Sequence, residues 1–515
     1  MDQKAVVIGA GMGGLAAAIR LAAAGLSVTL IEAAEGPGGK MRSFPSAAGP
    51  VDCGPTVLTM RAVFDDLFAL AGQRLEEHLT LLAQTTLARH WWRDGSQLDL
   101  FADPVRNAAA IEAFGGAAAT ADFKRFDVLA AALYKAFEGP VMQASRPDLM
   151  GIVRNTVVAP SLWPALLPGL SLERRLSLSF RDHRLRQLFG RYATYVGGAP
   201  DLSPAVLALI WRAEAQGVWA VEGGMRRLAA ALADLAEGLG VRLIYGQSVK
   251  TITRQKGRVA SVTLADGSSL PCGHVVFNGD PRALEVGLLG QAPQQAVPRT
   301  ATTPRSLSAW VWAFAAKVSG PDLVHHNVFF GADPKLEFGP VAKGQMPLDP
   351  TLYVCAQDRT AGQRPTGPER FEIIMNGPAN RPLHAGEIDQ CRTRTFQTLA
   401  KFGLEFDPVP GAQALTTPAG FAERFPASQG AIYGRSPHGS FATFQRPTAR
   451  TALPGLYLAG GGAHPGAGVP MAALSGKHAA EAILSDLAST SALTPTAMPG
   501  GMSTGSRTMG EKRYP

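Results

Sequence analysis

The chain is poor in cysteine and in charge, and it has no long apolar run. Four cysteines occur among 515 residues, and no two of them form a CxxC pair. Scattered cysteines favour reduced thiols over a disulfide framework or a metal site. Because no run of 18 apolar residues occurs, we expect no transmembrane helix. A strand is predicted almost at the first residue, so we expect no signal peptide.

The charged fraction is low but the net charge is positive. Charged residues make up 17% of the chain, below the usual value of about 25%, and the net charge is +8. Such neutrality indicates a large core, an apolar substrate tunnel or a membrane-facing patch. A nucleic-acid partner is one interpretation of the positive charge. However, there is no recognised nucleic-acid motif and no Lys-rich tract, so an anionic membrane surface fits better.

The first 32 residues carry a dinucleotide-binding pattern. An apolar run ends in Gly9, a glycine turn leads into an alanine-rich stretch, and a second apolar run ends on Glu32. This order predicts a strand, a turn, a helix and a second strand. In such a turn Gly9 permits the tight bend, Gly11 lets a pyrophosphate approach, and Gly14 lets the helix pack closely. The helix start offers free N–H groups to phosphates, and Glu32 can accept from a ribose hydroxyl.

The loop after Glu32 indicates which dinucleotide binds. It contains Gly39, Lys40 and Arg42, and it resembles the extended fingerprint of the flavin amine oxidase and carotenoid desaturase superfamily. There the loop lies along the FAD pyrophosphate, so the resemblance favours FAD. Lys40 stands where many members carry Arg, and a lysine loses bidentate phosphate geometry.

A second glycine strip lies near the C-terminus, over residues 455–472. It predicts a strand, a turn with Gly461 and Gly462, and a helix from about Met471 to Leu487. The glycines let the backbone approach the ribityl chain. The helix start at Met471 and Ala472 directs N–H groups at the flavin O2 and N1, where negative charge develops on reduction.

Two further segments resemble the same superfamily. Residues 52–56, with Gly54 and Thr56, resemble a D-x-G-P-T segment that lies close to the flavin ring. Residues 217–279 predict a helix over 226–238, a strand over 241–245 and a meander of strands over 257–264, 268–272 and 275–278. The resemblance implies that Val249 meets the adenine through its backbone.

With the segments IYGR and QRP upstream of the second glycine strip, the chain is identified as a member of the bacterial carotenoid (phytoene-type) desaturase family. It looks most like the hydroxyneurosporene, or methoxyneurosporene, desaturase branch. The resemblance covers residues 4–486. It implies an FAD-dependent oxidoreductase that desaturates C3–C4 of 1-hydroxycarotenoids, on the way to spheroidene or spirilloxanthin. Phytoene desaturase is the alternative substrate assignment. A prenyl-lipid carrier of the GDP-dissociation-inhibitor type is the alternative from another class, against which the intact glycine motifs argue.

The implied chemistry demands little of the protein. Loss of a hydride from C4 to the flavin leaves a cation that the polyene delocalises, and loss of a C3 proton completes the double bond. No strong base is needed, and we predict no metal site. His464 is the candidate catalytic residue, with a structural hydrogen bond as the alternative. The electron acceptor is left open between oxygen and a quinone.

A membrane-docking segment is predicted over residues 155–172, which carry no charge and include Trp163 and Leu166. Its prolines prevent a straight spanning helix. Basic residues follow directly, and those proposed for docking are Arg174, Arg175, Arg181 and Arg184. The alternative is a buried helical lid. We therefore expect a cytoplasmic protein peripherally associated with the inner or photosynthetic membrane.

The predicted fold class is α/β. A Rossmann-type FAD-binding domain takes residues 1–80, 215–295 and 447–487, and a mixed-sheet substrate domain takes 81–110 and 296–446. A helical lid or membrane-docking subdomain takes residues 111–214. Residues 488–515 lack periodicity and predict a disordered tail.

Overall fold

A five-stranded parallel sheet gathers strands from distant parts of the chain. In the computed structural model, which describes residues 3–360 and 362–492, its order is β20-β13-β1-β2-β9. The strands are β1 (Lys4–Ile8), β2 (Ser27–Ile31), β9 (Arg242–Ile244), β13 (His274–Phe277) and β20 (Leu456–Leu458). Because parallel strands end at one edge of a sheet, the turn after β1, Glu32, Asn278 and the loop after β20 come together there.

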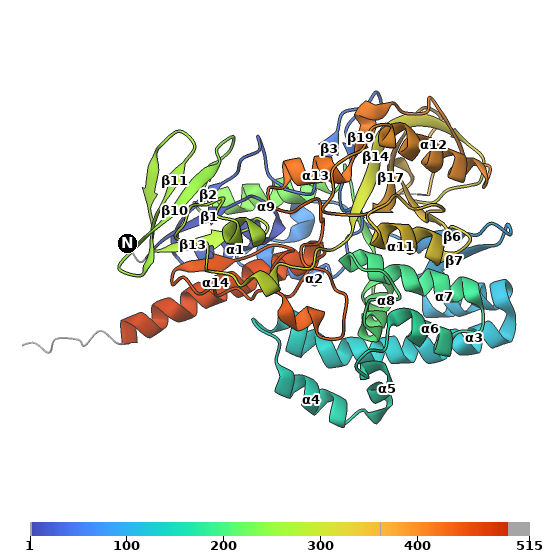
Figure 1. The fold of residues 1–515 in the computed structure, drawn as a ribbon, viewed down its shortest axis with the longest axis horizontal. Helices are drawn as coiled ribbons and strands as arrows, with labels where there is room; N and C mark the ends of the chain where they lie inside the picture. The colour runs from blue at the N-terminus through green and yellow to red at the C-terminus, as the bar shows by residue number, and fades with distance from the viewer. Residues whose placement is uncertain (1–2, 361, 493–515) are drawn as a thin grey trace, which may run out of the picture.

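Helices cover this sheet, as Figure 1 shows on its left side. They are α1 (Met12–Ala23), α2 (Ala62–Ala69), α9 (Arg226–Gly238) and α14 (Val469–Ala492). A Cβ atom placed on Gly476 of α14 would lie 2.3 Å from the carbonyl oxygen of Gly13, so this glycine lets α14 pack directly on the start of α1. The core between these helices and the sheet is rich in alanine, whose small side chain also permits close packing.

The prediction for the C-terminal helix was too short. Helix α14 begins at Val469 and extends through Ala492, so residues 488–492 are helical rather than a disordered tail. The rest of the predicted tail, 493–515, lies outside the described residues. The last residues of the helix are small or polar, so the sequence lacks the apolar periodicity that predicts a helix there.

An antiparallel three-stranded sheet sits beside the parallel one. It consists of β10 (Val249–Gln255), β11 (Arg258–Leu264) and β12 (Ser269–Pro271). The third predicted meander strand, 275–278, is wrong in its partner, because β13 pairs in parallel with β1 and β20 instead. Its run of four buried residues is typical of a parallel strand covered on both faces.

A second large sheet is mixed and has the order β18-β14-β17-β16-β15-β6-β7, with β19 beside β14. Its strands are β6 (Thr86–Trp91), β7 (Gln97–Phe101), β14 (Ser308–Ser319), β15 (His326–Phe329), β16 (Leu352–Ala356), β17 (Glu369–Gly377), β18 (Glu405–Asp407) and β19 (Leu415–Thr416). Its helices are α11 (Pro334–Ala342), α12 (Glu387–Ala400) and α13 (Pro418–Arg424), with α10 (Arg282–Glu285) after β13. Two short pairs, β3 (Ser43–Phe44) with β4 (Val51–Asp52) and β5 (Leu81–Ala83) with β8 (Trp219–Val221), complete the strands of the described residues.

Helices from α3 to α8 form a layer below the second sheet in Figure 1. They are α3 (Pro104–Phe137), α4 (Leu149–Val157), α5 (Trp163–Leu166), α6 (Leu172–Ser179), α7 (His183–Gly190) and α8 (Leu209–Ala215). The proline-rich segment is broken as predicted, because α4 ends before Pro160 and α5 spans only four residues. None of the described helices is long and apolar enough to cross a membrane.

Candidate functional site: a cavity between the two sheets and the helical layer

A cavity of about 2160 Å³ runs between the parallel sheet, the second sheet and the helical layer. Its wall includes the turn after β1, the loop after β2 and the 460–472 loop. It continues along β14, β16 and β17 and then along α4 to α8. The same space therefore connects both predicted glycine motifs with the helical layer.

The turn from β1 into α1 is shaped for close approach by a ligand. Gly9 has a φ of +99°, which L side chains rarely adopt, and Gly11 and Gly13 form part of the wall. A Cβ atom on Gly14 would lie 2.0 Å from the Gly9 carbonyl oxygen. Gly14 is not among the wall residues, so it acts through helix packing, as predicted. Helix α1 has no side-chain cap, which leaves its first N–H groups available to a phosphate.

Glu32 lies at the other end of this turn. Its carboxylate accepts hydrogen bonds from the backbone N–H groups of Ala10 (2.7 Å) and Ala34 (2.9 Å). These bonds fix the carboxylate at the wall, where it can accept from a ligand hydroxyl with its remaining lone pairs. Val249, at the start of β10, forms part of the wall nearby.

The second glycine strip faces the first across Asn278. The Asn278 amide donates to the Gly9 carbonyl oxygen at 3.1 Å. A Cβ atom on Gly460 would lie 2.6 Å from Asn278 Oδ1, and one on Gly462 would lie 2.5 Å from Pro281. Gly461, Gly462, Met471 and Ala472, predicted to contact FAD, all form part of the wall. Asn278 thus holds the two glycine strips together.

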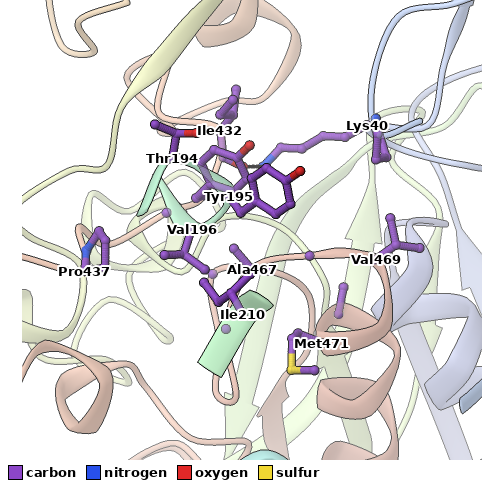
Figure 2. Close-up of a pocket in the computed structure, with 18 of the residues that line it drawn as sticks. Lys40, Thr194, Tyr195, Val196, Ile210, Ile432, Pro437, Ala467, Val469 and Met471 are labelled. Atoms are coloured by element: carbon purple, nitrogen blue, oxygen red, sulfur yellow. Dashed lines mark hydrogen bonds between the residues drawn. The ribbon is translucent and has the colours of Figure 1, made fainter. Parts of the chain in front are cut away.

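Cations line the cavity next to these strips. The Lys40 ammonium donates to the Ile432 carbonyl oxygen at 2.5 Å, and Figure 2 shows this side chain reaching toward Ile432 above Tyr195. Burial lowers the pKa of Lys40 to about 8; nearby Asp280 opposes this shift, and Arg305 and Arg446 add to it. Arg42 donates to the Thr416 hydroxyl at 2.9 Å. With Gly39, Gly54 and Thr56, these side chains form one side of the wall.

These features fit a flavin dinucleotide. Even a Cβ atom on Gly11, Gly13, Gly460 or Gly462 would lie within 3.0 Å of a neighbouring atom. The start of α1 has no side-chain cap, and the Glu32 carboxylate is fixed at the wall. The flavin containing amine oxidoreductase family matches residues 12–484. The chain belongs to this family.

Two relatives sharpen the assignment. A hydroxyneurosporene desaturase of Cereibacter sphaeroides is 66% identical over 488 residues, which are 95% of this chain and 99% of that protein. A 1-hydroxycarotenoid 3,4-desaturase of Flavobacterium sp. is 28% identical, with 93% of this chain and 99% of that protein covered. The solved structure of putrescine oxidase bound to putrescine has a TM-score of 0.59 at 15% identity. It covers 94% of this chain and 99% of its own, and it confirms the fold. The protein is therefore an FAD-dependent oxidoreductase of the flavin containing amine oxidoreductase family.

His464, the candidate catalytic residue, lies outside the wall of the cavity. Its side chain is buried, it is not among the residues of the cavity wall, and its Nε2 atom donates to the Ala144 carbonyl oxygen at 3.0 Å. Burial lowers its pKa, and the ring stacks on His478 at 5.7 Å. The structure thus favours the structural alternative, in which His464 ties the loop after β20 to the segment that follows α3.

The predicted docking residues separate into two groups. Trp163 is half exposed, and Leu166 and Arg174 form part of the cavity wall. In contrast, Arg181 pairs with Asp122 at 3.0 Å and Arg184 pairs with Asp182 at 2.7 Å.

The guanidinium group of Arg184 also stacks on Phe114 at 3.9 Å. Arg175 is half-buried, and burial lowers its pKa. Arg181 and Arg184 therefore hold the helical layer together, a role that net charge in the sequence does not reveal.

Several residues that build the site were not predicted. Arg446 donates to the carbonyl oxygens of Gly461 (2.8 Å) and Tyr433 (3.0 Å), and Arg305 pairs with Asp280. These contacts brace the second glycine strip. Arg446 lies in the segment QRP, which was noticed only as a family marker, so the signal was present without its physical reason.

Proposed function

We propose that the protein is a 1-hydroxycarotenoid 3,4-desaturase that acts on hydroxyneurosporene or a close relative. The observation that carries the proposal is the continuity of the cavity. The wall with the glycine strips continues without interruption into an apolar wall from Ala309, Val311, Val328, Phe330 and Ile374. A long polyene needs such an apolar channel beside the flavin, because its burial is driven by the hydrophobic effect.

The 66% identity to a hydroxyneurosporene desaturase supports this substrate over phytoene. Bound FAD supplies the oxidising power by accepting a hydride from the substrate. The residues of the chain bind and orient the flavin and the polyene. Asn278 and Arg446 hold the glycine strips in place, and the strands of the second sheet present apolar side chains to the polyene. These walls also exclude water from the reacting bond.

The test is a turnover assay with three substrates. Purified protein reconstituted with FAD is incubated with phytoene, neurosporene and 1-hydroxyneurosporene, and product spectra are recorded. We expect flavin absorbance in the protein and a new double bond only in 1-hydroxyneurosporene. A colourless protein that binds prenyl lipids would indicate a carrier instead, and turnover of phytoene would indicate a phytoene desaturase. Anaerobic turnover with and without a quinone decides between oxygen and quinone as the electron acceptor.

We also propose that the protein docks on an anionic membrane through α4 and the segment after it. Six large apolar side chains here are more than half exposed: Leu149, Met150, Val153, Val157, Val158 and Leu167. Trp163 joins them, and Leu167 also forms part of the cavity wall. An exposed apolar patch of this kind marks an interaction site. The cavity thus reaches the patch, which gives an insoluble carotenoid a path from a bilayer.

Flotation with anionic liposomes at two salt concentrations tests the docking face. Replacing Met150, Val153 and Val158 with Ser is expected to weaken flotation at both salt concentrations, because apolar burial is lost. Replacing the exposed Arg146, Arg154 and Arg174 with Gln is expected to weaken it at low salt, since each basic residue contributes about 1 kcal/mol.

The matched control replaces Arg254, Lys256 and Arg258, three exposed basic residues of β10, β11 and the turn between them, which lie outside the proposed docking face. This variant is expected to float like the unmodified protein. Unchanged flotation of the apolar variant would contradict the proposal and indicate a lid at this position.

A further inference from the structure

A glutamic acid without a partner lies in the wall of the cavity. Glu372 in β17 is 0% exposed, and neither carboxyl oxygen has a hydrogen-bond partner among the residues that the structure describes. Because side chains alternate along a strand, Glu372 shares the face of Ile374, and both form part of the cavity wall. A carboxyl group in this position is costly unless a ligand satisfies it.

Other buried glutamates show how unusual this is. Glu337 accepts from Thr351 N (3.2 Å) and Asn376 Nδ2 (2.8 Å), and Glu369 pairs with Arg359 at 2.7 Å. Glu214 accepts from the hydroxyl groups of Tyr192 and Tyr195, both at 2.8 Å. Glu372 alone of these four lacks a protein partner in the described chain.

The surroundings keep this carboxyl group neutral. Burial raises its pKa well above the usual value, Asp52 adds to the shift, and Arg42 opposes it. It lies between Ala313 of β14 and Cys355 of β16 in the sheet register. A neutral carboxyl group can donate one hydrogen bond and accept another, which is what a hydroxyl group requires of its partner.

The neighbouring polar groups are already occupied. The Tyr353 hydroxyl contacts Thr56 Oγ1 and His326 Nδ1, both at 2.7 Å. Arg42 Nη2 donates to Thr416. The Arg42 Nε atom also lacks a partner, but it can only donate. In this part of the wall Glu372 is therefore the unpartnered group that can also accept a hydrogen bond.

The chemistry of the substrate supplies a matching group. In a 1-hydroxycarotenoid the hydroxyl group is attached to C1, and C1 is two bonds from C3. When the 3,4-bond lies against the flavin, the hydroxyl group therefore lies close to the flavin as well. We propose that Glu372 binds the C1 hydroxyl group of the substrate and thereby selects the hydroxylated end for desaturation. This inference rests on the proposed 1-hydroxycarotenoid 3,4-desaturase function.

The test compares 1-hydroxyneurosporene with neurosporene, which lacks the hydroxyl group. In the Glu372→Leu holoenzyme we expect the preference for the hydroxylated substrate to fall about 10- to 100-fold, in kcat/KM and in equilibrium binding. FAD content should be unchanged. The Tm should rise, because an unpartnered buried carboxyl group is replaced by an apolar side chain. Glu372→Met is the second apolar variant if the Leu variant loses its flavin.

Two controls separate hydroxyl binding from other roles. Glu372→Gln keeps one donor and one acceptor, so its substrate preference should stay within about threefold of the unmodified enzyme. Glu337→Gln changes a cavity-wall glutamate with protein partners and should leave the preference unchanged.

An unchanged preference in the apolar variants overturns the inference. Loss of turnover on every substrate in Glu372→Gln also overturns it, because that result identifies a proton acceptor. If the unmodified enzyme desaturates no hydroxycarotenoid, the proposed function fails instead, and the two failures are distinguishable.

Discussion

The two ends of the cavity are built from different parts of the chain. At the cofactor end the wall is mostly backbone, with Gly9, Gly11, Gly461 and Gly462 forming the surface. At the substrate end the wall consists of side chains from the second sheet and the helical layer. A wall made of backbone restricts the sequence strictly, because only glycine lets a ligand approach the backbone closely. A wall made of side chains restricts the sequence little, because many apolar residues can occupy each position.

The largest expected effect comes from closing the backbone wall. Gly11→Val is expected to abolish FAD binding, because the side chain would occupy the cavity and its Cβ atom would lie 2.9 Å from Asn278 Nδ2. Flavin content after purification measures this. Gly238→Val is the matched control, since nothing lies within 4 Å of a Cβ atom there. A Gly11→Val enzyme with a full complement of flavin would show that the phosphates bind elsewhere.

A smaller effect is expected from the polar contact at the same end. Glu32→Ala should weaken FAD binding by about 1.5–3 kcal/mol, which is the usual contribution of a hydrogen bond to a charged group. The rate of the chemical step should not change, because the ribose is remote from the reacting atoms. Titration of the apoprotein with FAD and single-turnover kinetics measure the two quantities. Glu35→Ala, on the same loop and exposed, is the control. Normal FAD affinity with a slow chemical step would contradict the assignment of Glu32.

The sequence predicted the backbone wall of the site better than it predicted the side-chain contacts. The strand, turn and helix around Gly9 to Gly14 were predicted correctly because spacing and glycine content are local properties. Glu372 was missed, since its isolation depends on strands β14 and β16, which lie far away in the sequence. Arg181 and Arg184 were assigned to a membrane surface because Asp122 and Phe114, which they contact, lie far away in the sequence and are brought to them only by the fold.

The side-chain wall should tolerate change better than the backbone wall. Val311→Ala removes two methyl groups from the substrate end, and each buried carbon contributes about 0.8 kcal/mol, so kcat/KM is expected to fall by no more than about 15-fold. Flavin content is expected to stay complete. Steady-state kinetics with 1-hydroxyneurosporene measures the effect. Loss of flavin in this variant would show that the substrate end of the cavity also determines FAD binding.

The smallest effect on chemistry is expected at His464, which lies behind the wall. His464→Asn removes the hydrogen bond to the Ala144 carbonyl oxygen, which contributes about 1 kcal/mol, while kcat stays within about twofold. The pH dependence of stability gives a sharper test. Burial lowers the pKa of His464, so the unfolded chain binds its proton more readily, and the imidazole destabilises the fold as pH falls below about 6.5. Asparagine does not titrate. The variant should therefore be less stable than the unmodified enzyme at pH 8, and the difference should shrink as pH falls toward 5. Thermal unfolding across this range measures it, and a large loss of kcat at constant flavin content would restore His464 as a catalytic residue.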